Sequence, residues 1–307
     1  MTTPAIRLTI IFAFFLLAIS DRSPAAGQTP STSGKVISLG IISETHQTEI
    51  EEHFRDFVNY IALKFSPAQA MEGKVIVVPR VADLGPLLRQ GTVDFYLESP
   101  YPTYVINNVY AAAHLLLRRW KSGMADYQSF IFTKRNSGIT RLSDLLGKMI
   151  VFEDPESTSG YFLPKLFLQR NGFKFSQKNS SDVISSQEIG YIFAHSQNVV
   201  DVVLAGGATA GAFSDDDYNR LDEKKKAEIA VLAQTDRLPR HLVSVRNDLP
   251  APVVYRLREI LLSMHEDAEG RRILQKTDET TKFDFLPGGE EGMRRRLLET
   301  FYAPEKR

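Results

Sequence analysis

The sequence predicts an α/β protein of two lobes, each a mostly parallel β-sheet flanked by helices, with a ligand cleft between the lobes. Two observations lead to this fold class. Short apolar runs that are typical of buried strands alternate with amphipathic stretches, which is the pattern of parallel strands joined by helices. The 307 residues also exceed the usual size of one domain, so each lobe can bury its own core.

The chain is expected to start and finish in the first lobe. Residues 36–126 and 241–307 form that lobe, and residues 127–240 form the second. Extended stretches that begin at Tyr127 and at Asp236 are suited to carry the chain out and back.

Residues 1–25 are predicted to be a signal peptide, and residues 26–35 a flexible leader. Arg7 precedes an apolar run, and a motif of small residues that ends at Ala25 predicts cleavage after that residue. The run is too short to span a bilayer. We therefore expect an exported, periplasmic protein with no direct membrane insertion after the signal is removed.

Strands and helices alternate in the first lobe. Phe54, Phe57 and Ile61 recur at helical spacing and predict a helix that covers a sheet. Ser99 caps a further helix, with Pro100 at its first position. The other expected elements are strands at residues 36–42, 74–78 and 93–97 and helices at residues 50–65 and 84–90.

The second lobe repeats this alternation, and the chain then returns. A charged stretch, residues 215–226, is interpreted as a solvated helix, and the Ser-rich residues 173–188 as a polar segment that includes loop. Residues 120–124 are also interpreted as loop. The remaining expected elements are strands at 127–133, 149–152, 209–213 and 228–234 and helices at 142–146, 163–170, 199–205 and 252–264, with a shorter and a closing helix after them.

The turn after the strand at residues 149–152 is the strongest candidate site. It contains Ser157, Thr158, Ser159 and Gly160, directly before a helix. Hydroxyl groups there lie beside backbone N–H groups that a first helical turn leaves unpaired, at the positive end of the helix dipole. Such a place suits an oxyanion. The alternative is that a serine of the turn only caps the helix.

Other polar residues follow strands of the first lobe. Ligands of open parallel sheets bind at the carboxyl ends of the strands, where Ser43, Glu98, Ser99 and Tyr101 are expected. Capping and turn formation are the alternative roles of these residues.

Composition excludes several classes of partner. Lys plus Arg and Asp plus Glu both total 37, and this zero net charge gives no sign of a nucleic-acid partner. The sequence has no cysteine, which excludes disulfides, thiolate metal sites and lipid attachment through an N-terminal Cys. It has no Walker or dinucleotide-binding motif, and we expect no cofactor and no metal. We expect a monomer.

In this ordered set of motifs the chain resembles the PhnD-like periplasmic proteins of ABC transporters that bind phosphate, phosphite or phosphonate. The motifs run in the family's order: Val93-Asp94, Ser99-Pro100 with Tyr104, Tyr127-Gln128-Ser129, residues 142–148, Asp154-Pro155, residues 157–160, Pro164 and His195. The resemblance covers residues 36–302 and implies the type II periplasmic binding protein fold, which closes around its ligand.

The resemblance also implies site residues. Ser157, Thr158 and Ser159 would hold a phosphorus oxyanion and His195 would face it, so that its oxygens are satisfied without a buried cation. Members of the family commonly have an acidic residue at the position where this chain has Thr209, and its loss weakens the case for an aminoalkyl ligand. Glu98, beside the expected pocket, could instead pair with a cationic end of the ligand or with a protonated oxyanion.

Three acidic residues flank the turn. Glu153, Asp154 and Glu156 are expected to point outward or to donate as acids, because ionised carboxylates would repel the anion.

The expected function is capture of the oxyanion by lobe closure and its delivery to the membrane permease of an ABC transporter. A sensor that docks on a membrane histidine kinase is the alternative, because the residues do not separate the two partners. An enzyme is disfavoured, since the chain lacks the Gly-x-Ser-x-Gly elbow of a serine hydrolase.

Overall fold

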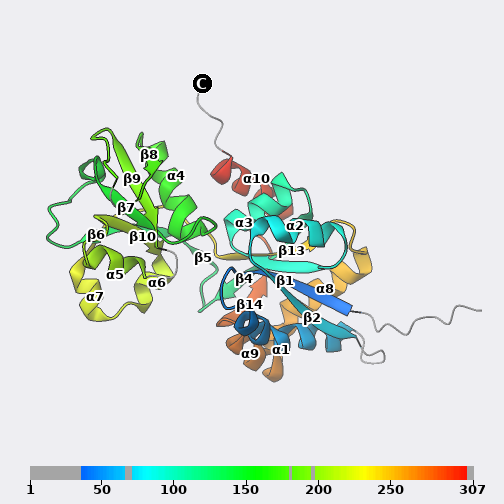
Figure 1. Ribbon diagram of the computed structural model, residues 1–307. Helices are drawn as coiled ribbons and strands as arrows, with labels where there is room; N and C mark the ends of the chain where they lie inside the picture. Colours follow the sequence, from blue (N-terminus) through cyan, green and yellow to red (C-terminus); the bar gives the residue numbers. More distant parts are fainter. Residues whose placement is uncertain (1–35, 66–70, 180–181, 195–197, 303–307) are drawn as a thin grey trace, which may run out of the picture. The chain divides into compact units, whose positions relative to one another are not determined.

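The computed structural model describes residues 36–65, 71–179, 182–194 and 198–302. The expected signal peptide and leader, and His195, lie outside the described residues. The described part forms two six-stranded sheets and a small two-stranded one (Figure 1).

The first sheet has the order β14-β4-β13-β3-β1-β2. Within it β1 pairs in parallel with β2 and with β3, while β13 is inserted antiparallel between β3 and β4. Its strands are β1 (Val36–Ile42), β2 (Glu72–Val78), β3 (Phe95–Glu98), β4 (Ala113–Lys121), β13 (His241–Arg246) and β14 (Thr280–Asp284).

Helices cover both faces of the first sheet. One face packs on α1, α8 and α9, and the other on α2, α3 and α10. Their bounds, with two short helices between them, are α1 (Gln47–Phe65), α2 (Val81–Arg89), α3 (Pro100–Tyr104), η1 (Val105–Val109), α8 (Ala251–Ser263), η4 (Met264–Glu266), α9 (Ala268–Lys276) and α10 (Gly289–Phe301).

The second sheet has the order β11-β6-β10-β7-β9-β8. Strands β10, β7, β9 and β8 run parallel, and β6 joins them antiparallel. Its strands are β6 (Ser129–Lys134), β7 (Met149–Phe152), β8 (Lys174–Gln177), β9 (Glu188–Phe193), β10 (Ala210–Ser214) and β11 (Ile229–Gln234).

The helices of the second sheet also form two layers. Apolar side chains from α4 fill one face, and those from α5 fill the other. Their bounds, with two short helices, are η2 (Leu142–Leu145), η3 (Thr158–Phe162), α4 (Leu163–Arg170), α5 (Val199–Leu204), α6 (Asp215–Arg220) and α7 (Glu223–Glu228).

Two short strands lie between the sheets in the sequence, β5 (Asp126–Tyr127) and β12 (Leu238–Pro239). They pair antiparallel, with Leu238 opposite Tyr127. The α/β fold class is confirmed, since strands of residues 36–121, 241–246 and 280–284 form one sheet and strands of residues 129–234 the other. The lobe boundaries at residues 126/127 and 240/241 stay predictions.

Two local expectations need correction. The polar segment at residues 173–188 includes loop, as expected, and residues 174–177 add a strand, β8, because their backbone pairs with β9 at the sheet edge. The expected loop at Trp120 and Lys121 is the end of β4. The charged stretch divides into α6 and α7, and it is not wholly solvated, because Asp215 and Asp216 are buried at the start of α6.

Candidate functional site

The turn between β7 and η3 ends at Ser157, which caps the start of η3. Ser157 Oγ accepts from Gly160 N at 2.9 Å and donates to Glu153 Oε2 at 2.7 Å. The hydroxyl thus satisfies one of the N–H groups that the first helical turn leaves unpaired. Capping, one of the two roles considered for this serine, is therefore its role in the structure.

Thr158 connects this turn to the first sheet. Its side chain is buried, and its Oγ1 accepts from Tyr101 N at 2.9 Å and lies 2.9 Å from Ser99 Oγ. Ser99 and Tyr101 are at the start of α3, directly after β3. The structure thus brings together three of the predicted site residues, which are 57 and 59 positions apart in the sequence.

Two aromatic rings also pack between the start of α3 and η3. Tyr101 of α3 stacks on Phe162 of η3 with an interplanar angle of 18°. Desolvation raises the pKa of the Tyr101 hydroxyl to about 12, with further contributions from the charge of Glu156 and from nearby tyrosines. Tyr101 is therefore a neutral aromatic wall at neutral pH.

Ser159 and Gly160 lie on the inner side of the turn. Both are buried, and Glu153 N donates to Gly160 O at 3.2 Å. A Cβ on Gly160 would collide with the Glu153 side chain, so this close approach requires glycine. Burial raises the pKa of the Tyr127 hydroxyl, while its hydrogen bonds with Thr158 and Ser159 oppose that shift. The side chain of Tyr127 thus contacts the turn from the crossing strand β5.

Glu156 differs from its expectation. It is half-buried, and both of its carboxylate oxygens accept from Val81 N, at 3.1 and 3.3 Å, at the start of α2. The favourable end of the α2 dipole offsets the loss of water, although desolvation still raises the pKa of this carboxyl. The expectation that Glu156 points outward or donates as an acid is wrong.

Glu98 joins the carboxyl ends of two neighbouring strands. Its Oε1 accepts from Ile42 N at 2.9 Å and its Oε2 from Ser99 N at 3.2 Å. Desolvation raises its pKa to about 7, and the two backbone donors reduce that shift. Close to neutral pH this side chain therefore exists both with and without its proton.

Ser43 lies in the loop after β1. Its N–H donates to Val78 O at 2.8 Å, and its hydroxyl donates to Thr45 O. It shares the carboxyl edge of the sheet with Glu98, through the neighbouring Ile42. The hydroxyl of Ser43 thus bonds locally and does not reach the turn at residues 157–160.

Thr209 lies at the opposite edge of the second sheet. Its N–H donates to Met149 O at 2.8 Å, at the amino end of β7, whereas the turn follows the carboxyl end of that strand. Thr209 therefore does not replace an acidic residue beside the turn, which corrects the expectation. Two acidic residues that follow β10, Asp217 and Asp222, line a cavity.

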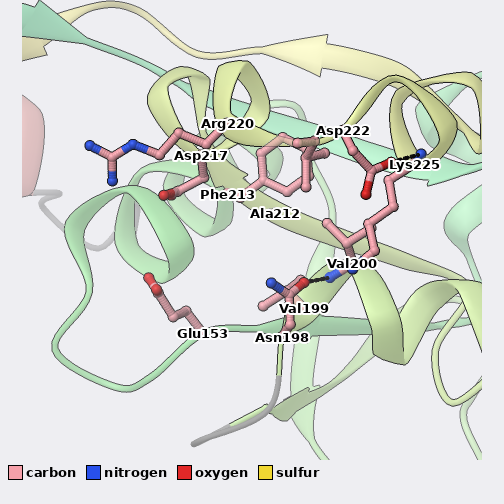
Figure 2. A pocket seen from close by; sticks show the side chains of 11 residues that line it. Glu153, Asn198, Val199, Val200, Ala212, Phe213, Asp217, Arg220, Asp222 and Lys225 are labelled. Carbon is pink, nitrogen blue, oxygen red and sulfur yellow. Dashed lines mark hydrogen bonds between the residues drawn. The ribbon is translucent and has the colours of Figure 1, made fainter. Parts of the chain in front are cut away.

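That cavity, of about 600 Å³, opens at the carboxyl ends of β7 and β10 (Figure 2). Figure 2 shows Glu153, Asp217 and Arg220 at one end of the cavity and Lys225 with Asp222 at the other. The lining residues carry both signs of charge and are Glu153, Asn198, Val199, Val200, Ala212, Phe213, Asp217, Arg220, Leu221, Asp222 and Lys225.

Glu153 links the cavity to the turn, because it lines the one and accepts from Ser157 of the other. Desolvation raises the pKa of its carboxyl, and the charges of Asp217 and Asp154 add to this rise. The cavity lies where ligands of open parallel sheets bind.

Sequence reasoning missed Arg240, which follows β12. Its side chain is buried, and its Nη2 donates to Asp216 Oδ2 at 2.6 Å. The sequence places this arginine only in the segment that returns the chain to the first lobe. Its burial is revealed by the fold alone.

Neither a metal cluster nor a membrane-spanning helix occurs in the described ranges. Among these residues, no group of three or more His, Asp or Glu side chains is placed to hold a metal ion. Of the helices at residues 36–302 that the structure describes, none is long and apolar enough to cross a membrane.

Solved structures with the same fold are known. XAC2383 from Xanthomonas citri, bound to ATP, is 27% identical, with a TM-score of 0.78 over 87% of this chain and 96% of that chain. PhnD1 from Prochlorococcus marinus, in complex with methylphosphonate, is 14% identical, with a TM-score of 0.63 over 87% of this chain and 97% of that one.

The periplasmic aliphatic sulphonate binding protein SsuA from Escherichia coli is 13% identical, with a TM-score of 0.53 over 88% of this chain and 87% of that one. At their low identities, PhnD1 and SsuA are similar in fold alone. The fold is that of the type II periplasmic binding proteins, as expected.

The family described as "ABC transporter, phosphonate, periplasmic substrate-binding protein" matches residues 39–284. This range includes strands of both sheets, the turn at residues 157–160 and the start of α3. It is most of the sequence, and the ordered motifs lie within it. The chain therefore belongs to the periplasmic phosphonate-binding proteins of ABC transporters.

Proposed function

We propose that the protein captures an anionic phosphorus compound, a phosphonate, phosphite or phosphate group, between the turn at residues 157–160 and the start of α3. One observation supports this most. Ser99 Oγ and Tyr101 N each lie 2.9 Å from Thr158 Oγ1, although Thr158 follows a strand of one sheet and the other two residues follow a strand of the other. Hydroxyl and backbone N–H groups that converge on one point are the donors that a tetrahedral oxyanion needs.

The same donors satisfy one another in this structure. Anion binding therefore exchanges these hydrogen bonds for stronger ones to a charged group, in which donor and acceptor distances are shorter. The proposed contacts are the turn residues Ser157, Thr158, Ser159 and Gly160, with Ser99, Tyr101, Glu98 and Ser43 at the first sheet and His195, which lies outside the described residues.

The cavity next to the turn extends the proposal to the rest of the ligand. Its volume of about 600 Å³ is within the usual range for sites of small organic molecules. The relative XAC2383 is bound to ATP and PhnD1 to methylphosphonate, so phosphorus anions of very different size occur on this fold. We propose that an organic substituent, where there is one, enters the cavity past Glu153.

The partner in this proposal is a membrane permease. After export and removal of residues 1–25, the monomeric protein closes on its ligand in the periplasm and presents the complex to the permease. The family description, which names ABC transporters, favours this partner over a sensor kinase. The role is binding with no bond broken.

A thermal-shift panel tests the proposal. Phosphate, phosphite, methylphosphonate, 2-aminoethylphosphonate, ATP and sulfate are added one at a time, each at up to millimolar concentration. A ligand at one hundred times its dissociation constant adds about 2.7 kcal/mol to the free energy of unfolding, which raises the melting temperature by several degrees. A melting temperature that no phosphorus compound changes would contradict the proposed ligand class.

A further inference from the structure

Arg240 keeps two unpaired donors in a buried position. Only 6% of the residue is exposed, and of its guanidinium only Nη2 is paired, to Asp216 Oδ2 at 2.6 Å. The Nε and Nη1 groups are buried and have no hydrogen-bond partner among the described residues. Unpaired donors of a buried cation are costly, so a group that satisfies them would bind strongly.

The guanidinium lies next to the oxyanion turn. Arg240 N donates to Ala125 O at 2.8 Å, which fixes this residue beside the strand pair β5 and β12. Its Cζ is 5.4 Å from the centroid of the Tyr127 ring. Tyr127 packs on Leu163, the first residue after η3, and its hydroxyl lies close enough to Thr158 and Ser159 for these residues to lower its pKa. One side chain therefore separates the unpaired donors from the turn.

Several cations near Arg240 share carboxylates. Arg119 and Lys121 are buried and share one carboxylate, that of Asp278, at 3.0 and 2.5 Å. Arg240 in turn shares Asp216 with Arg220, and Arg220 also pairs with Glu279.

His241 adds no charge to this group. Burial and the neighbouring cations hold the pKa of His241 well below its usual value, so its ring is neutral. In these ion pairs four cations share three carboxylates, and Glu98 also acts electrostatically on Arg119.

We propose that Arg240 Nε and Nη1 bind the anionic group that the turn at residues 157–160 receives. The fork of a guanidinium matches two oxygens of a tetrahedral phosphoryl, phosphonyl or sulfonyl group. This inference rests on the proposed function and deepens it: the site supplies a buried cation, where the sequence predicted only hydroxyls, amides and an imidazole. It also places the counter-charge on the segment by which the chain returns to the first sheet.

A purely mechanical role for Arg240 makes a different prediction. Arg240 and Arg237 both link the crossing segment to the start of α6, Arg240 through Asp216 and Arg237 through Asp215 at 3.0 Å. Arg237 also donates to Asp126 O, and its side chain is 46% exposed. If the ion pair to α6 were all that mattered, loss of either arginine would have the same effect.

The test is calorimetric titration with methylphosphonate, inorganic phosphate and ATP as probes. Arg240→Gln is expected to weaken binding of every probe that the unaltered protein binds by about 10- to 100-fold, the loss of hydrogen bonds to a charged group. Arg237→Gln, the matched control, is expected to stay within about twofold. Asp216→Asn is expected to tighten binding, because it removes the carboxylate that competes for the guanidinium.

Two outcomes overturn this inference alone: equal losses in Arg240→Gln and Arg237→Gln, or a loss in Asp216→Asn as large as that in Arg240→Gln. Melting curves show whether each variant folds. If Arg240→Gln does not, Arg240→Lys keeps the charge without the fork, and unchanged affinity in that variant overturns the bidentate contact. Failure of the unaltered protein to bind any probe overturns the proposed function and this inference with it.

Discussion

The Glu98 carboxylate joins the ends of β1 and β3 at a cost in hydration. Its two backbone donors, Ile42 N and Ser99 N, do not fully replace water, and its pKa rises from 4.5 to about 7. The folded protein therefore keeps this proton at pH values where the unfolded chain has lost it. Stability from this group is present below pH 4.5 and is lost as the pH rises to about 7.

Glu98→Gln should flatten this pH dependence. Denaturant unfolding at several pH values should show that the free energy of unfolding of the unaltered protein falls between pH 4.5 and 7 relative to the variant, by up to about 3 kcal/mol. Glu188→Gln is the control, because the neighbouring Ser176 hydroxyl and the Lys178 ammonium, 3.1 Å from Glu188 Oε1, lower the pKa of Glu188 and so place its effect at lower pH. The same slope in Glu98→Gln and the unaltered protein would contradict the shifted pKa.

At this scale the sequence predicted residue types better than contacts. The hydroxyl run at Ser157 to Ser159 was recognisable, because hydroxyl side chains before a helix have few roles. The contacts of this turn were not predictable from the sequence. Glu156 accepts from Val81, 75 positions away, and Thr158 accepts from Tyr101, 57 positions away. Arg240 gave no signal, because its two unpaired donors matter only when the residue is buried.

The turn and η3 form one element whose shape depends on a missing side chain. The backbone of Gly160 lies against the Glu153 side chain, while Ser157 Oγ bonds to both residues. The turn can therefore approach β7 closely enough to place Thr158 at the start of α3.

Gly160→Ala should destabilise the protein by about 1 to 3 kcal/mol, because the added methyl group forces Glu153 and Ser157 apart. The cost should fall in part in a Glu153→Ala background, which removes the collision with Glu153 Oε2 and keeps those with Glu153 Cβ and Ser157 Oγ. A double-mutant cycle of melting temperatures or denaturant midpoints measures this coupling. Equal costs of Gly160→Ala in the two backgrounds would show that the contact with the Glu153 carboxylate is not part of the cause.

Elements with clear periodicity were predicted, and the edge strand β8 was not. The helix at residues 50–65 and the strand at residues 149–152 agree with α1 and β7, since each buries a regular apolar pattern. Strand β8 is partly exposed at a sheet edge and has no such pattern. The charged start of α6 has the pattern of a solvated helix. Asp216 is buried there beside Arg240 and Arg220, with which it forms ion pairs that the sequence pattern does not show.

At the scale of the whole molecule, one short turn connects the two sheets. Glu156 accepts from the first N–H of α2, and Thr158 from Tyr101 N of α3. Both helix starts therefore receive oxygen atoms from the same turn of the other sheet. The division into two sheets followed from the alternation of strands and helices, whereas this contact required the fold.

Glu156→Ala should expose the start of α2. Hydrogen exchange of Val81 N–H should accelerate by about tenfold or more, since this group donates to the Glu156 oxygens at 3.1 and 3.3 Å and to no other acceptor among the described residues. Glu156→Gln keeps one acceptor and should preserve part of the protection. The Asp83 amide, bonded to Arg80 O at 3.0 Å, serves as the internal reference. Unchanged exchange at Val81 in Glu156→Ala would contradict this contact between the sheets.

Titration of methylphosphonate into three forms of the protein tests the central claim most directly, that the turn and the start of α3 together bind a phosphorus oxyanion. The unaltered protein and Thr158→Ser, which keeps the hydroxyl, should bind with similar affinity. Thr158→Val, which keeps the shape but loses the hydroxyl, should bind about tenfold or more weakly. Equal affinity of Thr158→Val and the unaltered protein, or no binding of methylphosphonate or any other phosphorus oxyanion to the unaltered protein, would contradict the claim.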